Sequence, residues 1–175
     1  FFTSDNGAAK RFDGIHNSSG VMQGKKRSLN EGGIRVPMVV RWPGKIKAGR
    51  VSSHPWYFPD VMPTFAEIGG VSTEVPEDID GISILPTLLD KGVQKQHEYM
   101  FWQYGVRAVR SGKWKGIGKG GHLYLYDLSE DIEEKNDLSS KHPEIAARMK
   151  KYITIGYREP RSQKDDGKYT GKDKK

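Results

Sequence analysis

Four short segments rich in aromatic and β-branched residues lie close together in the second half of this chain, and they constrain its fold more than any other feature. The segments are residues 99–104, 107–110, 113–117 and 123–128. Each has the length and composition of a strand, and Ser111-Gly112 has the composition of a two-residue hairpin turn. This pattern predicts a small antiparallel sheet.

One amphipathic helix is expected to cover this sheet. Pro143 suits the first position of a helix, and Glu144 lies near its start, where a negative charge complements the helix dipole. Ile145, Met149 and Ile153 share one face of such a helix. The second half is therefore predicted to be a sheet with a helix on it.

The first hundred residues follow a different order: strand, long loop, strand, helix, helix. Residues 1–4 are expected to end a buried strand, and 36–42 (VPMVVRW) to form a parallel strand buried on both faces. Asp60 is expected to cap one short helix, and the apolar stripe at 82–89 marks a second. This order is typical of an α/β sheet, with too few strands to complete one. We therefore expect the chain to be part of a longer protein.

Composition and charge exclude several classes of protein. The 175 residues carry a net charge of +7 and include no cysteine, which excludes disulfides and thiolate chemistry. No apolar run approaches the length of a membrane span. The Lys and Arg residues are scattered, with no basic helix or aromatic platform for nucleic acid. We expect neither a membrane nor a nucleic-acid partner, and we expect residues 158–175 to be a disordered polar tail.

Two segments could form a binding site, and each has an ordinary alternative. Asp5-Asn6-Gly7 directly follows a strand and offers hard oxygen ligands for Ca²⁺ or Mg²⁺, but an Asx turn, a common loop structure, is the more ordinary interpretation of this tripeptide. The cations at 25–27 precede the glycine pair 32–33 and could hold an oxyanion, or could form a solvated basic loop. The glycine-rich segment 116–121 is interpreted as a hairpin loop, and the acidic segment 127–137 as a solvated turn.

Six sequence blocks occur in a fixed order along the chain. They are SDNGAA, GKKRSLNEGGIRVPMVVRWPGKI, HPWYFPDVMPTFAEIGG, DGISILPTLL, AVRSGKWK and LYDLSEDIEEKNDLSSKHPEIAARM. Together they resemble the C-terminal part of the formylglycine-dependent sulfatases, in the alkaline phosphatase-like superfamily, over roughly residues 1–155.

The resemblance implies an α/β fold in which a C-terminal portion of the sulfatase sheet is followed by a small antiparallel sheet under a C-terminal helix. Residues 1–95 would belong to the catalytic domain and 96–157 to the antiparallel subdomain, with 158–175 as the tail.

The resemblance also implies chemistry. Asp5 and Asn6 would ligate a divalent cation, Ca²⁺ or alternatively Mg²⁺, and Lys26 would be the catalytic lysine that binds the substrate sulfate. The substrate would be a sulfated small molecule or glycan, hydrolysed to an alcohol and sulfate through a covalent sulfo-enzyme. The formylglycine nucleophile, in a Cys/Ser-x-Pro/Ala-x-Arg motif, would lie in the missing N-terminal part of the same enzyme. The fragment alone is therefore expected to be inactive, and the intact enzyme to be bacterial and periplasmic or secreted.

Two alternative functions stay open. A phosphomonoesterase or phosphodiesterase would use the same scaffold. The net charge of +7 would also suit a basic module that binds nucleic acid or an acidic polysaccharide, whose binding would depend strongly on salt.

Overall fold

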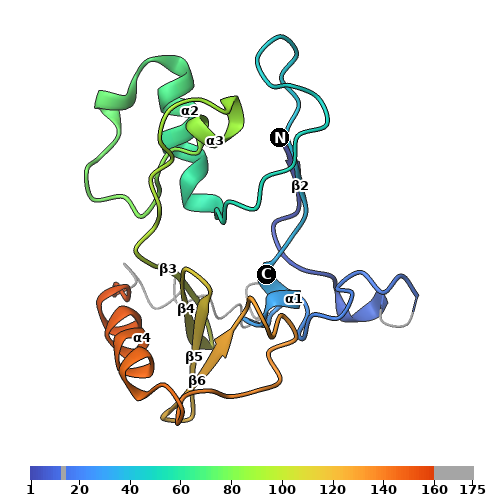
Figure 1. Cartoon of the computed structure of the whole chain (residues 1–175), viewed down its shortest axis with the longest axis vertical. Helices are drawn as coiled ribbons and strands as arrows, with labels where there is room; N and C mark the ends of the chain where they lie inside the picture. The colour runs from blue at the N-terminus through green and yellow to red at the C-terminus, as the bar shows by residue number, and fades with distance from the viewer. Residues whose placement is uncertain (13–14, 160–175) are drawn as a thin grey trace, which may run out of the picture. The chain divides into compact units, whose positions relative to one another are not determined.

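The computed structural model describes residues 1–12 and 15–159, which form two compact units (Figure 1). The first unit consists of Phe1–Thr3 and Met38–Met100, and the second of Ser4–Pro37 with the residues from Phe101 onward. The tail expected at 158–175 lies outside the described residues except for its first two positions. The domain boundaries expected near residues 95 and 157 stay a prediction.

A four-stranded sheet forms the centre of the second unit, as predicted. Its strands follow the order β3 (Met100–Tyr104), β4 (Val106–Ser111), β5 (Trp114–Lys119) and β6 (His122–Asp127). Strands β4, β5 and β6 pair antiparallel. Ser111 pairs with Trp114, so the turn between β4 and β5 is Gly112-Lys113, one residue later than predicted. The glycine-rich segment is mainly strand, because only Gly120 and Gly121 lie outside β5 and β6.

Helix α4 (Pro143–Ile155) covers one face of this sheet (Figure 1), and it begins at the proline that the sequence indicated. Met149 is fully buried at the contact. Strand β5 carries Gly116 there, where an added Cβ would lie 2.9 Å from the Cβ of Met149. Gly116, which was predicted to lie in a hairpin loop, therefore allows helix and strand to approach closely.

The opposite face of the sheet is covered by the N-terminal segment of the same unit. Leu29 joins a buried cluster with Ala108 and Ile117, and Ile34 packs against that cluster. Ile34 ends helix α1 (Glu31–Ile34), which the sequence suggested as a glycine turn. The sheet is therefore buried on both sides, and its second cover comes from residues more than seventy positions earlier in the chain.

The strand expected at 36–42 is not a buried parallel strand. Strand β1 (Phe2–Thr3) pairs antiparallel with β2 (Met38–Val39). Phe2 and Val39 are 75% and 62% exposed in the described chain. A continuous apolar run does not specify which strand it pairs with or in which direction, so the prediction had no basis for choosing.

Two short helices of the first unit lie close to their predicted positions, α2 at Val61–Gly69 and α3 at Leu85–Leu89. Asp60 precedes α2, but its side chain does not cap the helix. Its carboxylate accepts the N–H groups of Tyr57 at 3.0 Å and Ile82 at 2.8 Å and lies 2.8 Å from Nε2 of His97. Asp60 therefore joins three segments of this unit. Residues 1–12 and 15–159 also include the 3₁₀ helices η1 (Lys10–Phe12), η2 (Phe58–Asp60) and η3 (Ser72–Glu74).

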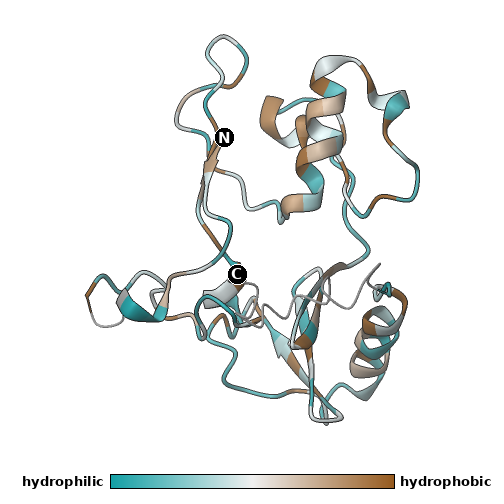
Figure 2. Cartoon of the chain, turned by 180° about the vertical axis from the view of Figure 1, so that it is seen from behind, coloured by the Kyte–Doolittle hydropathy of each residue, from teal (hydrophilic) through white to brown (hydrophobic). Residues whose placement is uncertain are grey.

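Apolar residues remain at the surface of the first unit. Figure 2 shows β1 and much of α2 in the apolar colours. The ring of Phe1 packs 5.2 Å from that of Phe65, yet both side chains are about half exposed. Across residues 1–12 and 15–159, no helix has the length and apolar character needed to cross a bilayer.

Candidate functional site

The segment Asp5-Asn6-Gly7 follows β1 as predicted, with Ser4 between the end of the strand and Asp5. Asp5 is exposed and Asn6 is half-buried. The hydroxyl of Ser4 donates a hydrogen bond to the carbonyl of Asn6 at 2.9 Å, and the N–H of Gly7 donates to the carbonyl of Gly33 at 2.9 Å. The candidate metal ligands are therefore connected through the backbone to the end of α1.

The segment that carries Lys26 lies against the same backbone. The N–H of Lys26 donates to the carbonyl of Ala8 at 2.9 Å, and the N–H of Ser28 closes a turn onto the carbonyl of Lys25 at 2.8 Å. The Lys26 side chain is exposed. The fold thus brings the Lys26 segment next to the residues that directly follow Asp5 and Asn6.

Three glycines make this close approach possible. A Cβ on Gly7 would lie 2.0 Å from the carbonyl oxygen of Gly32, and one on Gly33 would lie 2.1 Å from the carbonyl oxygen of Ser28. A Cβ on Gly32 would meet the carbonyl of Gly24 at 2.4 Å. Each contact is with backbone, which cannot move aside as the end of a side chain can. The two segments can pack onto α1 only because these positions lack side chains.

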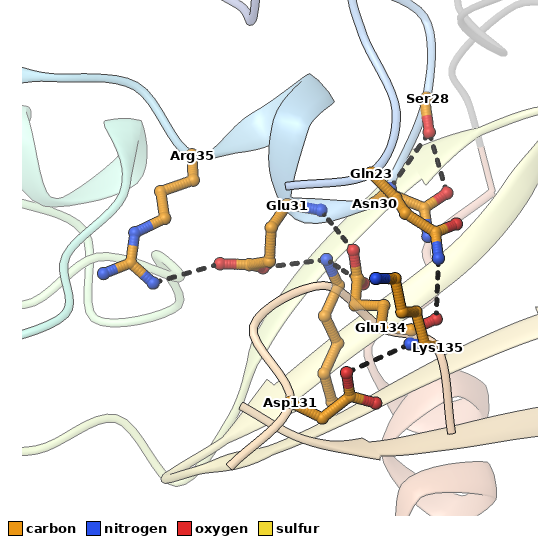
Figure 3. A network of polar contacts seen from close by, with 9 residues as sticks. Gln23, Ser28, Asn30, Glu31, Arg35, Asp131, Glu134 and Lys135 are labelled. Atoms are coloured by element: carbon orange, nitrogen blue, oxygen red, sulfur yellow. Dashed lines mark hydrogen bonds and ion pairs between the residues drawn. The ribbon is translucent and has the colours of Figure 1, made fainter. Parts of the chain in front are cut away.

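A buried ionic network lies beneath α1 (Figure 3). Nζ of Lys115, on β5, is 2.8 Å from Oε1 of Glu31 and 2.9 Å from Oε1 of Glu134. The N–H of Glu31 also donates to Oε2 of Glu134 at 2.7 Å. These three side chains are at most 3% exposed. We call Glu31, Lys115 and Glu134 the buried triad.

The buried triad corrects one expectation from the sequence. Glu134 belongs to the acidic segment that was interpreted as a solvated turn, yet it is buried. Two other acidic side chains of that segment also accept hydrogen bonds from the backbone. The carboxylate of Asp131 accepts one from the N–H of Asn136 at 2.8 Å, and that of Asp137 accepts one from the N–H of Leu125 at 3.0 Å. The segment is an ordered loop in which carboxylates satisfy N–H groups.

The charge of Glu31 is stabilised inside the protein. Burial by itself would raise the pKa of Glu31, but Lys115 above all, with Arg110 and Arg35, holds that pKa below its usual value. Arg35 lies 3.4 Å from Oε2 of Glu31. A buried carboxylate with an adjacent ammonium and hydrogen bonds stays ionised, which suits a structural ion pair.

Sequence reasoning missed the triad, although one signal was present. Lys115 is two positions from Ile117 in a predicted strand, so both side chains lie on the same face. If Ile117 faces a core, Lys115 must face it too and must find acidic partners. Which of the chain's acids these partners are depends on contacts far apart in sequence.

The candidate metal ligands fit a hard cation as part of a ligand shell. A carboxylate and a side-chain amide carbonyl are the oxygen donors that Ca²⁺ and Mg²⁺ prefer, and Ca²⁺ takes about six to eight of them. Within the part of the chain that the structure describes, no three His, Cys, Asp or Glu side chains cluster to hold an ion. Asp5 and Asn6 alone would supply two ligands of such a shell.

Solved structures share this fold. The crystal structure of Ps i-CgsB superimposes with a TM-score of 0.76 at 29% sequence identity, covering 89% of this chain and 35% of that one. A sulfatase structure from work on glycosaminoglycan metabolism by Bacteroides thetaiotaomicron gives a TM-score of 0.72 at 30% identity, covering 89% of this chain and 38% of that one. The architecture is therefore one seen in experimentally determined sulfatases.

Sequence relatives and a family model agree with the fold. Mouse steryl-sulfatase is 40% identical over 130 residues, which cover 67% of this chain and 20% of the relative. The N-acetylgalactosamine-6-O-sulfatase of Bacteroides thetaiotaomicron is 32% identical over 183 residues, covering 87% of this chain and 35% of the relative. The chain thus spans about a third or less of these relatives. Residues 23–156 match the family model described as N-sulphoglucosamine sulphohydrolase, C-terminal, so the chain belongs to the sulfatase family and corresponds to its C-terminal region.

Proposed function

We propose that this chain is the C-terminal part of an enzyme that hydrolyses sulfate monoesters to an alcohol and sulfate. The observation that carries the proposal is the hydrogen bond from the N–H of Lys26 to the carbonyl of Ala8, in a chain of the sulfatase family. It joins a segment with an exposed ammonium to the residues that follow Asp5 and Asn6. A segment with an ammonium, adjacent to a segment with oxygen ligands for a cation, suits the binding of a sulfate ester.

Each of these residues has a specific proposed role. The Lys26 ammonium would donate to a non-bridging sulfate oxygen and stabilise negative charge as the S–O bond breaks. The carboxylate of Asp5 and the side-chain carbonyl of Asn6 would hold Ca²⁺ or Mg²⁺. When bound, such a cation polarises sulfate oxygens. The nucleophile, a formylglycine, would come from the upstream part of the protein.

We propose a sulfated glycan as the substrate class. Two structural relatives were solved with sugars: Ps i-CgsB in complex with k-i-k-neocarrahexaose, and a sulfatase-fold protein in complex with its substrate D-glucosamine-2-N,6-O-disulfate. The bacterial relatives also support a bacterial enzyme, and we propose a periplasmic or secreted location for it.

The test uses the complete protein, made by joining this chain to the sequence encoded upstream of it. Its turnover is measured on an aryl sulfate and on the matched aryl phosphate. We expect the sulfate to be hydrolysed and the Asp5→Ala variant to lose this activity while its circular dichroism is unchanged. A preference for the phosphate ester would replace the proposal with a phosphoesterase. Absence of turnover on either ester, with formylglycine confirmed by mass spectrometry, would reject it.

A further inference from the structure

We propose that the buried triad positions the two site loops, defined as residues 5–8 and 23–28, and is not simply a stabilising ion pair. The inference rests on the proposed function, because these loops carry the residues proposed to contact cation and sulfate. Hydrogen bonds connect the triad to α1, and α1 to both site loops.

Two members of the triad, Lys115 and Glu134, hold the third, Glu31, which is the first residue of α1. Glu31 is bound at its carboxylate by Lys115 at 2.8 Å and at its backbone N–H by Glu134 at 2.7 Å. Lys115 comes from the sheet, and Glu134 from the ordered loop after β6. The start of α1 is therefore attached to two elements that lie far from it in sequence.

Helix α1 in turn holds both loops by backbone hydrogen bonds. The N–H of Gly7 donates to the carbonyl of Gly33 at 2.9 Å, and the N–H of Gly32 donates to the carbonyl of Gln23 at 2.7 Å. The side chain of Gln23 also donates to the backbone carbonyl of Glu134 at 3.2 Å. A displacement of Glu31 would therefore shift Gly32 and Gly33, and through their hydrogen bonds it would shift both loops.

Helix α1 cannot hold this position by itself. It has four residues and no side-chain hydrogen bond at its N-cap, and a single helical turn is unstable without tertiary contacts. Two of its residues are glycines, which contribute no side-chain packing. A buried ion network is a weak source of stability compared with apolar side chains of similar size, but it requires defined geometry. That combination suits a positioning role.

Three variants separate positioning from stability. Lys115→Met leaves two carboxylates without their cation. The triple variant Glu31→Leu/Lys115→Met/Glu134→Leu replaces the triad with apolar side chains, a change that often preserves stability. Lys113→Met is the matched control, because this exposed lysine on the same hairpin pairs with Asp127 at 2.6 Å and does not contact the triad.

The first measurement is amide hydrogen exchange in this 175-residue chain, which does not depend on any enzymatic activity. The reporters are the N–H groups of Gly7, Lys26 and Gly32, compared with the ladder amides of β4 and β5. We expect Lys115→Met and the triple variant to increase the exchange rates of the reporter amides at least about tenfold more than those of the ladder amides. Lys113→Met should leave the exchange rates of the reporters unchanged. Should Lys115→Met fail to fold, the triple variant decides. Equal acceleration of reporters and ladder amides, or none, would overturn the proposal.

The second measurement is steady-state kinetics of the complete enzyme carrying the triple variant. A misplacement of about 1 Å at a reacting group costs roughly a hundredfold in rate, so we expect kcat to fall by that order with a small change in KM. An unchanged kcat in the folded triple variant would overturn the positioning role. If the unmodified complete enzyme hydrolyses no sulfate ester, the proposed function fails, and hydrogen exchange alone decides whether the triad positions the loops.

Discussion

Lys26 is the residue at which the competing interpretations of this chain differ most. It is exposed, it lies between two other cations, and its backbone is bound to Ala8. In a basic loop the three cations would be interchangeable, because each contributes a similar field. In the proposed sulfatase role, Lys26 alone would make a direct contact that strengthens as charge develops in the transition state.

We therefore expect Lys26→Ala in the complete enzyme to lower kcat/KM by about a hundredfold or more. The Arg27→Ala control should cost much less, because exposed charges act through screening solvent. Aryl sulfate turnover at low and high ionic strength measures both effects. Equal losses that disappear together at high salt would identify a solvated basic loop.

We expect this chain to bind a cation only weakly through Asp5 and Asn6. Two side-chain oxygens fill only part of a shell of about six to eight ligands, and water must supply the rest. Isothermal titration calorimetry with Ca²⁺ should accordingly show binding no tighter than the millimolar range. Micromolar affinity that Asp5→Ala removes would mean that the residues of this chain already complete the site.

Asp137 shows how a single carboxylate stabilises the loop after β6. Its Oδ1 accepts the N–H groups of Leu125 and Ser139, and its Oδ2 lies 2.9 Å from Nε2 of His122. Partial burial would raise the pKa of Asp137, but the hydrogen bonds from His122, Leu125 and Ser139 lower it to about 2.

Because this pKa is lower in the folded state, the contribution of Asp137 is complete above the unfolded value, near 4, and is lost as the pH falls toward 2. We expect Asp137→Asn to reduce the free energy of unfolding by about 1–2 kcal/mol at pH 7. The difference from the unmodified chain should shrink below about pH 4. Urea unfolding of both proteins at several pH values tests this, and a penalty that does not change with pH would contradict it.

At the scale of elements, the contact between β5 and α4 depends on Gly116. A Cβ there would lie 2.9 Å from the Cβ of Met149, whereas a Cβ on Gly118 would lie 3.4 Å from Cδ1 of Ile153. The first neighbour is fixed close to the helix backbone, and the second is the end of a flexible side chain. The two glycines of one strand therefore form a matched pair.

We expect Gly116→Ala to destabilise the chain by about 1–3 kcal/mol, because it pushes α4 away from the sheet. Gly118→Ala should cost clearly less. Thermal or urea unfolding of the two variants provides the comparison, and equal effects would show that helix and sheet adjust to the added methyl group without cost.

At the scale of the whole molecule, the chain spans 20% of mouse steryl-sulfatase and 35% of the Bacteroides relative. It contains no cysteine, and the nucleophile proposed for the complete enzyme is not among its residues. We expect the purified 175-residue chain to hydrolyse no aryl sulfate above a Lys26→Ala control. Turnover by this chain that exceeds the control would show that a different nucleophile operates.

The family, the four strands of the second unit and the start of α4 could all be predicted from the amino-acid sequence. Strand periodicity and the helix-start preference of Pro143 are local properties, so residues within one segment are enough to reveal them. The sulfatase blocks can likewise be read along the chain without a structure. The turn at Gly112 was one residue off, because several neighbouring positions suit a two-residue turn.

The surfaces that contact one another could be identified only once the chain's fold was known. The antiparallel pairing of β1 with β2, the contacts of the Asp60 carboxylate with Ile82 and His97, and the burial of Glu134 beside Lys115 all join residues that are distant in sequence. A charged residue looks the same in sequence whether it is solvated or buried, because its cost of burial depends on a partner that local pattern cannot identify. For the same reason the acidic loop was predicted to be solvated, while the fold uses one of its glutamates to hold α1.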